Sequence, residues 1–294
     1  MKNFSKSSLY LLVAVAMMGC GGGGDTSATS GASDTPAIGG GGAAVTLPGA
    51  ADTAAACFNP MLLVEGNSYR TVVRATYSGQ GTEQQVLDST VEGSVKFNGV
   101  SATKSTSTQA NTPDAALMAK GQTSDVSSGA SYYSLDASTG SVNFLGFDSS
   151  FGVTPSEKID VKTVYNPYIE TRLSLKPGQS FDQSYSKTET ISRSNGTTQS
   201  PIVNYKKNVL FVAIAPVTVP AGTFMACQFV ETGTRADAAS LPGAVPISAG
   251  VATIWRSVGS GLPLKSTYTS TAQGSISSTF ELMSATINGS AVTQ

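Results

Sequence analysis

Apolar and polar side chains alternate with a period of two along most of the chain beyond residue 67. In the segment 68–77, for example, Val73, Ala75 and Tyr77 fall on one face and Arg74 falls on the other. This alternation is typical of a half-buried β-strand, because successive side chains of a strand point to opposite sides of its sheet.

Turn residues divide this pattern into hairpins. Asn98-Gly99 and Asn195-Gly196 each stand between two alternating segments, and Asn-Gly is a strong hairpin signal because both turn positions need positive φ. Helical periodicity is nearly absent, and two segments, 50–57 and 113–120, fit a short helix. The predicted strands cover residues 68–77, 83–97, 101–109, 130–135, 142–147, 181–193, 197–215, 223–231, 252–257, 264–271 and 276–287.

The predicted fold is therefore mainly β: a single antiparallel curled sheet with one or two short helices. About ten or more strands exceed what an open sheet holds comfortably, so we expect a half-barrel or a barrel. Residues 44–294 are long enough for one β-rich domain of this kind.

The beginning of the chain has the features of an export signal. Lys2 and Lys6 precede an apolar run that is shorter than the roughly 20 residues of a transmembrane helix. The following Met17-Met18-Gly19-Cys20 resembles the lipobox of bacterial lipoproteins. This resemblance implies that residues 1–19 are a signal peptide, removed when the Cys20 sulfur receives diacylglycerol and the new amino group is acylated. The alternative is a plain secreted protein in which Cys20 has no role.

A flexible tether follows the predicted lipid anchor. Residues 20–43 contain two runs of four glycines among Ser, Thr and Ala, and cannot form a core. Gly21, and not Asp, follows Cys20, and the resemblance to enterobacterial lipoproteins then favours the outer membrane. We expect a membrane-anchored domain that faces the periplasm, with exposure at the cell surface as the alternative.

Composition limits the partners. The net charge is −1 and charged residues make up 13% of the chain, so no basic face for nucleic acid is expected. Ser, Thr, Gly and Ala replace the missing charges, which suits an exported β-protein with hydroxyl-lined solvent faces. Cys57 and Cys227 are a disulfide candidate in an oxidising compartment, with two separate buried thiols as the alternative. Two cysteines without a histidine do not form a tetrahedral metal site.

Nothing in the chain predicts an enzyme or a bound cofactor. The absence of histidine removes Ser-His-Asp and Cys-His catalysis and nearly all zinc hydrolase sites. Two Ser-x-x-Lys pairs, Ser101 with Lys104 and Ser184 with Lys187, lie on predicted strands where serine and lysine point to opposite faces. Two acids could support glycoside hydrolysis, but we expect solvated surface groups for the candidates of the predicted central loops, Glu157, Asp160, Glu170 and Asp182.

Three segments carry a family resemblance. Residues 217–224 read Val-Thr-Val-Pro-Ala-Gly-Thr-Phe, residues 175–181 read Leu-Lys-Pro-Gly-Gln-Ser-Phe, and residues 255–262 read Trp-Arg-Ser-Val-Gly-Ser-Gly-Leu. Together they resemble envelope proteins with a curled antiparallel sheet, many of them uncharacterised lipoproteins. The resemblance covers residues 173–268 and implies a likeness to periplasmic lipoprotein carriers, in which an unclosed barrel cups acyl chains. Without the family, residues 217–224 predict a hairpin corner, because proline cannot donate to a ladder.

Two functions are compatible with these observations. The first is a binding module for an apolar or lipid ligand, with a cavity lined by Phe144, Phe147, Phe211, Phe229, Trp255 and Phe280. The second is a structural module that docks to another envelope protein, with a filled interior and an exposed patch that includes Tyr132, Tyr133, Tyr165 and Tyr168.

Overall fold

The structure is a computed structural model that describes residues 52–121, 124–136, 139–154, 157–235, 250–270 and 277–293. Within these residues the chain is almost entirely strand, which confirms the predicted mainly β fold. The strands of the sheet are β1 (Ser68–Tyr77), β2 (Gly81–Phe97), β3 (Val100–Pro113), β4 (Asp125–Asp136), β5 (Ser141–Thr154), β6 (Glu157–Arg172), β7 (Ser180–Arg193), β8 (Thr198–Gln199), β9 (Ile202–Val219), β10 (Gly222–Arg235), β11 (Gly250–Ser257), β12 (Pro263–Ser270), β13 (Ser277–Ile287) and β14 (Ser290–Ala291).

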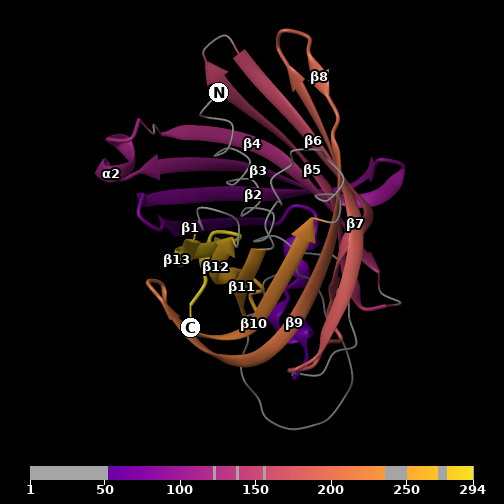
Figure 1. Ribbon diagram of the computed structural model, residues 1–294. Coiled ribbons are helices and arrows are strands. Elements are labelled where there is room, and N and C mark those ends of the chain that lie inside the picture. Colours follow the sequence, from indigo (N-terminus) through magenta and orange to yellow (C-terminus); the bar gives the residue numbers. More distant parts are fainter. Residues whose placement is uncertain are drawn as a thin grey trace.

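The sheet closes on itself. Apart from the short β8, strands that follow one another in the sequence are neighbours in the sheet, and β1 pairs antiparallel with both β2 and β13. Twelve strands therefore form a ring, beside which the two-residue strands β8 and β14 pair with β7 and β13 (Figure 1). Of the two shapes that the sequence left open, the structure has the barrel. The unclosed barrel implied by the resemblance to lipoprotein carriers is wrong for this chain.

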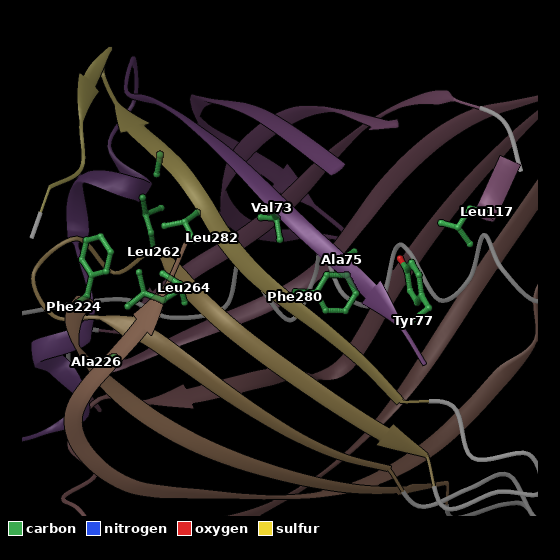
Figure 2. Close-up of a cluster of buried hydrophobic side chains, with 12 residues drawn as sticks. Val73, Ala75, Tyr77, Leu117, Phe224, Ala226, Leu262, Leu264, Phe280 and Leu282 are labelled. Carbon is green, nitrogen blue, oxygen red and sulfur yellow. The ribbon is translucent and has the colours of Figure 1, made fainter. Parts of the chain in front are cut away.

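Alternate residues of the ring build the core. On β1, Val73, Ala75 and Tyr77 are at most 6% exposed and pack with Phe280 and Leu282 of β13 (Figure 2). The same cluster receives side chains from β10 and β12 and from the turn before β12. Because each large apolar side chain contributes about 1.5–3 kcal/mol when fully buried, this shared face holds the strands in register.

A short N-terminal segment is fixed to the core. The 3₁₀ turn η1 (Ala54–Cys57) replaces the predicted helix over residues 50–57, of which residues 50 and 51 lie outside the described chain, and a second 3₁₀ turn, η2 (Pro60–Leu63), follows it. A disulfide joins Cys57 to Cys227 of β10, and both residues are completely buried. The Ala54 N–H also donates to the Leu175 carbonyl oxygen at 2.8 Å.

The remaining local predictions are mostly confirmed. Asn98 and Gly99 have φ values of 48° and 84° in the turn between β2 and β3, as an Asn-Gly hairpin requires. Val219 pairs with Gly222, so the proline-containing corner is the turn between β9 and β10. The second predicted helix is one turn, α2 (Ala115–Met118), and the Asp114 carboxylate caps it by accepting the Leu117 N–H at 2.8 Å.

One long strand, β6, was not predicted. It occupies the region that was predicted as central loops, and that prediction is wrong. Ile159 and Val161 are buried with an exposed residue between them, so the period of two is present. Pro167 lacks an N–H, and the pairing of β6 with β7 stops at Asn166. The interruption hid the strand, because it breaks the run of β-forming residues.

Candidate functional site

The predicted apolar cavity is not formed by the residues that the structure describes. Trp255 is half-buried against the core. The other five predicted lining residues are each at most 5% exposed: Phe144, Phe147, Phe211, Phe229 and Phe280. Two small hollows border this core, of about 30 Å³ and about 20 Å³, each little more than the space of one water molecule. The aromatic side chains fill the interior, and the prediction that they line a ligand cavity is wrong.

A large hollow lies on the other side of the sheet. It has a volume of about 1000 Å³, and we call it the polar trough. Its 24 lining residues come from β1 to β7, from β13 and from the turn after β13, and half of them are serine or threonine. Most of these residues occupy the strand positions that alternate with the core, so their side chains project away from it.

Antiparallel register arranges the side chains of the trough in cross-strand rows. The first row runs through directly paired residues of six neighbouring strands, Arg70, Asp88, Thr108, Ser128, Ser150 and Asp160. The second row runs beside it from β2 to β7 and consists of Thr90, Thr106, Ala130, Asp148, Lys162 and Thr190. Neighbouring strands are about 4.8 Å apart, so polar groups repeat at that spacing along each row.

Charges in the trough are balanced. Its lining contains three basic residues, Arg70, Lys104 and Lys162, and three acidic residues, Asp88, Asp148 and Asp160. Arg70 Nη1 donates to both Asp88 carboxylate oxygens at 2.7 and 2.8 Å.

Asp160 is held in its ionised form at the far end of the first row. Hydrogen bonds from the Lys158 ammonium and then from the Ser150 hydroxyl lower the pKa of the Asp160 carboxyl group. Its carboxylate lies 2.9 Å from Lys158 Nζ.

An aromatic pair adjoins the second row. The rings of Phe97 and Tyr132 stack with centroids 4.0 Å apart, and Lys162 Nζ lies 5.1 Å from the centroid of Phe97. The Tyr132 hydroxyl donates to Asp148 Oδ2 at 2.8 Å. Burial first, and the hydrogen bond to Asp148 second, raise the pKa of Tyr132, so its hydroxyl keeps its proton at neutral pH. The other Asp148 oxygen, Oδ1, is buried and has no hydrogen-bond partner in the described part of the chain.

The acids singled out in the sequence do not form one site. Asp160 lies in the polar trough, whereas Glu170 pairs with Arg172 at 3.0 Å and Asp182 accepts from Asn208 at 2.9 Å. Glu157 begins β6, and its side chain lies outside the described part. The residues that the structure describes contain no group of three or more His, Cys, Asp or Glu side chains placed to hold a metal ion.

The first Ser-x-x-Lys pair is engaged elsewhere. Ser101 Oγ accepts from Lys96 Nζ at 2.7 Å, and Lys104 Nζ donates to Glu92 at 2.6 Å.

The predicted tyrosine patch is largely buried. Tyr132 and Tyr133 are 8% and 2% exposed, and the ring of Tyr165 meets that of Tyr185 edge to face. Tyr168 alone of the four predicted residues is exposed, at 40%. The prediction of an exposed aromatic surface is therefore wrong for three of its four members.

The trough itself was not predicted as a site, although the sequence holds a signal for it. The outward positions of β2 to β5 are rich in Ser and Thr, which the composition already indicated.

Cys20 and the tether lie outside the described residues, so the lipid anchor stays a prediction. Among the described residues, no helix is long and apolar enough to cross a membrane.

Comparison with known proteins assigns this chain to no family. No protein-family model matches the chain, and no curated protein matches it. One similar solved structure is described as a "putative exported protein with YmcC-like fold" from Bacteroides fragilis, at 13% identity and a TM-score of 0.36. Another is a "putative lipoprotein" from Parabacteroides distasonis, at 11% identity and a TM-score of 0.36. Each likeness covers 76% of this chain and 96% of the other, and at this TM-score neither carries an argument about function.

Proposed function

We propose that this protein is a non-catalytic, lipid-anchored binding protein of the cell envelope, and that the polar trough is its ligand site. The observation that carries the proposal is the trough itself. Its volume of about 1000 Å³ is at the upper end of the range typical of small-molecule sites. It is built on strands of a closed barrel, which hold side chains more rigidly than loops do.

The sequence supports the place of action. The lipobox at residues 17–20 and the glycine-rich tether favour a domain held near a membrane by acyl chains on Cys20. Gly21 favours the outer membrane, and a disulfide between Cys57 and Cys227 suits an oxidising compartment such as the periplasm.

The chemistry of the trough favours binding over catalysis. Asp88 and Asp160 are engaged with Arg70 and Lys158, and an engaged carboxylate is a poor general acid. A chain without histidine also lacks the commonest general base at neutral pH.

The two functions weighed from the sequence are disfavoured in their original form. An apolar ligand has little room, because the aromatic side chains fill the interior. A docking module through exposed tyrosines is disfavoured because Tyr132, Tyr133 and Tyr165 pack within the fold. Neither argument applies to a polar ligand in the trough.

The experiment is native mass spectrometry of the processed protein, purified from its own envelope with a sugar-free detergent. Thr108 is exposed in the middle of the first row, and Thr108→Tyr should block the trough without disturbing the core. Thr232→Tyr is the matched control, because Thr232 is exposed towards the C-terminal end of β10 and does not line the trough.

We expect a bound mass on the wild type and on Thr232→Tyr that is lost from Thr108→Tyr. The same bound mass on all three proteins would place the ligand elsewhere and refute the trough as the site. Turnover of the bound molecule would show that the non-catalytic part of the proposal is wrong.

A further inference from the structure

We infer that the polar trough binds an uncharged, hydroxyl-rich chain, an oligosaccharide or a segment of a polysaccharide, laid across the strands. This inference rests on the proposed function and adds the class of ligand. Four properties of the trough support it: its charge balance, its lining, the spacing of its rows and one unsatisfied acceptor.

The balanced charge argues against a charged ligand. Three basic and three acidic residues line the trough, and Arg70 and Asp88 satisfy each other within it. A site for a phosphate, a nucleic acid or an acidic polymer carries an excess of positive charge, which raises the local concentration of the anion. This trough has no such excess, so its ligand carries little net charge.

The lining argues against lipids and peptides. Half of the 24 lining residues are serine or threonine, and Ala130 and Val161 are the two aliphatic side chains among them. An acyl chain needs an apolar wall for its binding free energy. Peptides use a free strand edge or apolar pockets, and the trough lies on the face of a sheet whose strands are paired on both sides.

The lining suits a ligand that carries many hydroxyl groups. A serine or threonine hydroxyl both donates and accepts, and it rotates to match its partner. Sugar hydroxyls do the same, so the two surfaces can exchange hydrogen bonds in either direction. Thr108 and Ser128 are exposed and adjacent in the first row, which leaves their hydroxyls accessible to such a ligand.

The rows give the site a direction. From Arg70 on β1 to Asp160 on β6 the first row crosses six strands, which corresponds to about 24 Å at the usual strand spacing. A chain of repeating units can make the same kind of contact on strand after strand along this row. The geometry therefore favours an extended oligomer over a single sugar.

Asp148 holds a buried, unsatisfied acceptor beside the rows. Its Oδ2 accepts from the Tyr132 hydroxyl, whereas its Oδ1 has no partner among the described residues. A buried polar atom without a partner costs free energy, which the hydroxyl of a ligand that reaches it would recover. The stack of Tyr132 on Phe97 holds this carboxylate in place.

The test is isothermal titration of the processed full-length protein, kept in a polyoxyethylene detergent that has no sugar headgroup. The probes are the neutral linear hexasaccharides of glucose and N-acetylglucosamine, and oligogalacturonate serves as the acidic comparison. Thr108→Tyr blocks the trough, Asp148→Asn replaces one carboxyl oxygen with an amide nitrogen at nearly constant volume, and Thr232→Tyr is the matched control.

We expect at least one neutral hexasaccharide to bind the wild type and Thr232→Tyr equally. Affinity should fall at least tenfold in Thr108→Tyr and by a smaller factor in Asp148→Asn. Because the ligand is uncharged, raising the salt concentration should leave the affinity nearly unchanged. A vesicle that carries the same glycan on a lipid distinguishes a membrane-linked chain from a free one, and binding to either supports the inference.

The inference is wrong if no neutral glycan binds, if the acidic oligomer alone binds, or if Thr108→Tyr binds as the wild type does. These outcomes are separate from a failure of the proposed function. A different polar ligand, found by native mass spectrometry and displaced by Thr108→Tyr, would leave the trough as the site and overturn only its assignment to glycans.

Discussion

Removing the disulfide between Cys57 and Cys227 tests how strongly the N-terminal segment stabilises the barrel. Both cysteines are completely buried, and the double variant Cys57→Ala/Cys227→Ala replaces them with small apolar residues. The remaining backbone bonds of the segment include Ala54 N–H to the Leu175 carbonyl and Gly259 N–H to the Ala56 carbonyl, each at 2.8 Å. These bonds should preserve the fold, so the variant reports the contribution of the cross-link.

The magnitude follows from the length of the loop that the disulfide closes. The two cysteines are 170 residues apart in the sequence. The chain-entropy model gives about 5 kcal/mol for a loop of this length, and removal of native disulfides typically costs about 2–5 kcal/mol. In a domain of this size, 1 kcal/mol shifts Tm by about 2–4 °C. We therefore expect the variant to unfold roughly 5–15 °C below the wild type.

The assay is differential scanning calorimetry, with urea unfolding as a second measurement. The control for the two substitutions is wild-type protein whose disulfide has been reduced in the unfolded state. Its stability is measured in reductant and compared with that of the double variant. Both should show the same lowered stability. An unchanged midpoint in the double variant, or two free thiols in the wild type by mass spectrometry, would refute the reasoning.

Three further predictions concern the sheet. Gly146 has a φ of 155°, and a Cβ there would collide with the Thr163 carbonyl oxygen, so Gly146→Ala should lower the free energy of unfolding in urea by about 3 kcal/mol or more. Gly233→Ala is the control and should change little, because the atom nearest to its added Cβ is 4.0 Å away. Burial raises the pKa of Glu83, so the stability that its protonated carboxyl group contributes is present at pH 4 and is lost as the pH rises. The free energy of unfolding of Glu83→Gln should therefore increasingly exceed that of the wild type between pH 4 and pH 8, and a difference that does not change with pH would contradict this. Hydrogen bonds from Arg74 and then from Lys265 lower the pKa of Glu281, so Glu281→Gln should cost about 1 kcal/mol at pH 7. This cost should shrink as the pH falls through the lowered pKa of the wild-type carboxyl group, and a cost that does not change with pH would contradict the prediction.

Local signals in the sequence predicted the hairpins well. The Asn98-Gly99 turn and the corner before Gly222 are present, because turn chemistry acts over two to four residues. The strand at residues 157–172 was missed because Pro167 interrupts it. In the structure, the Gln183 side chain restores the connection beyond that point by bonding both the N–H and the carbonyl of Glu170, at 3.0 and 3.2 Å. No local pattern in the sequence predicts this bond between Glu170 and Gln183, which lie on different strands.

The prediction of an aromatic cavity failed for a related reason. Alternation shows that Phe144 and Phe147 are buried on one face, but it does not show whether that face is filled. Phe58, from the N-terminal segment, packs into the same cluster and occupies the space. The sequence could not indicate this, because the contact joins residues more than 80 positions apart.

The amino-acid pattern is sufficient to predict most strands, most turns and the hydroxyl-rich outward positions, because each depends on residues close together in the chain. Closure of the barrel, the filled core and the polar trough depend on register. A shift of one residue in any strand would turn its polar row towards the core. The candidate binding site therefore exists only in the folded sheet, whose register pairs residues of four neighbouring strands: Arg70, Asp88, Thr108 and Ser128.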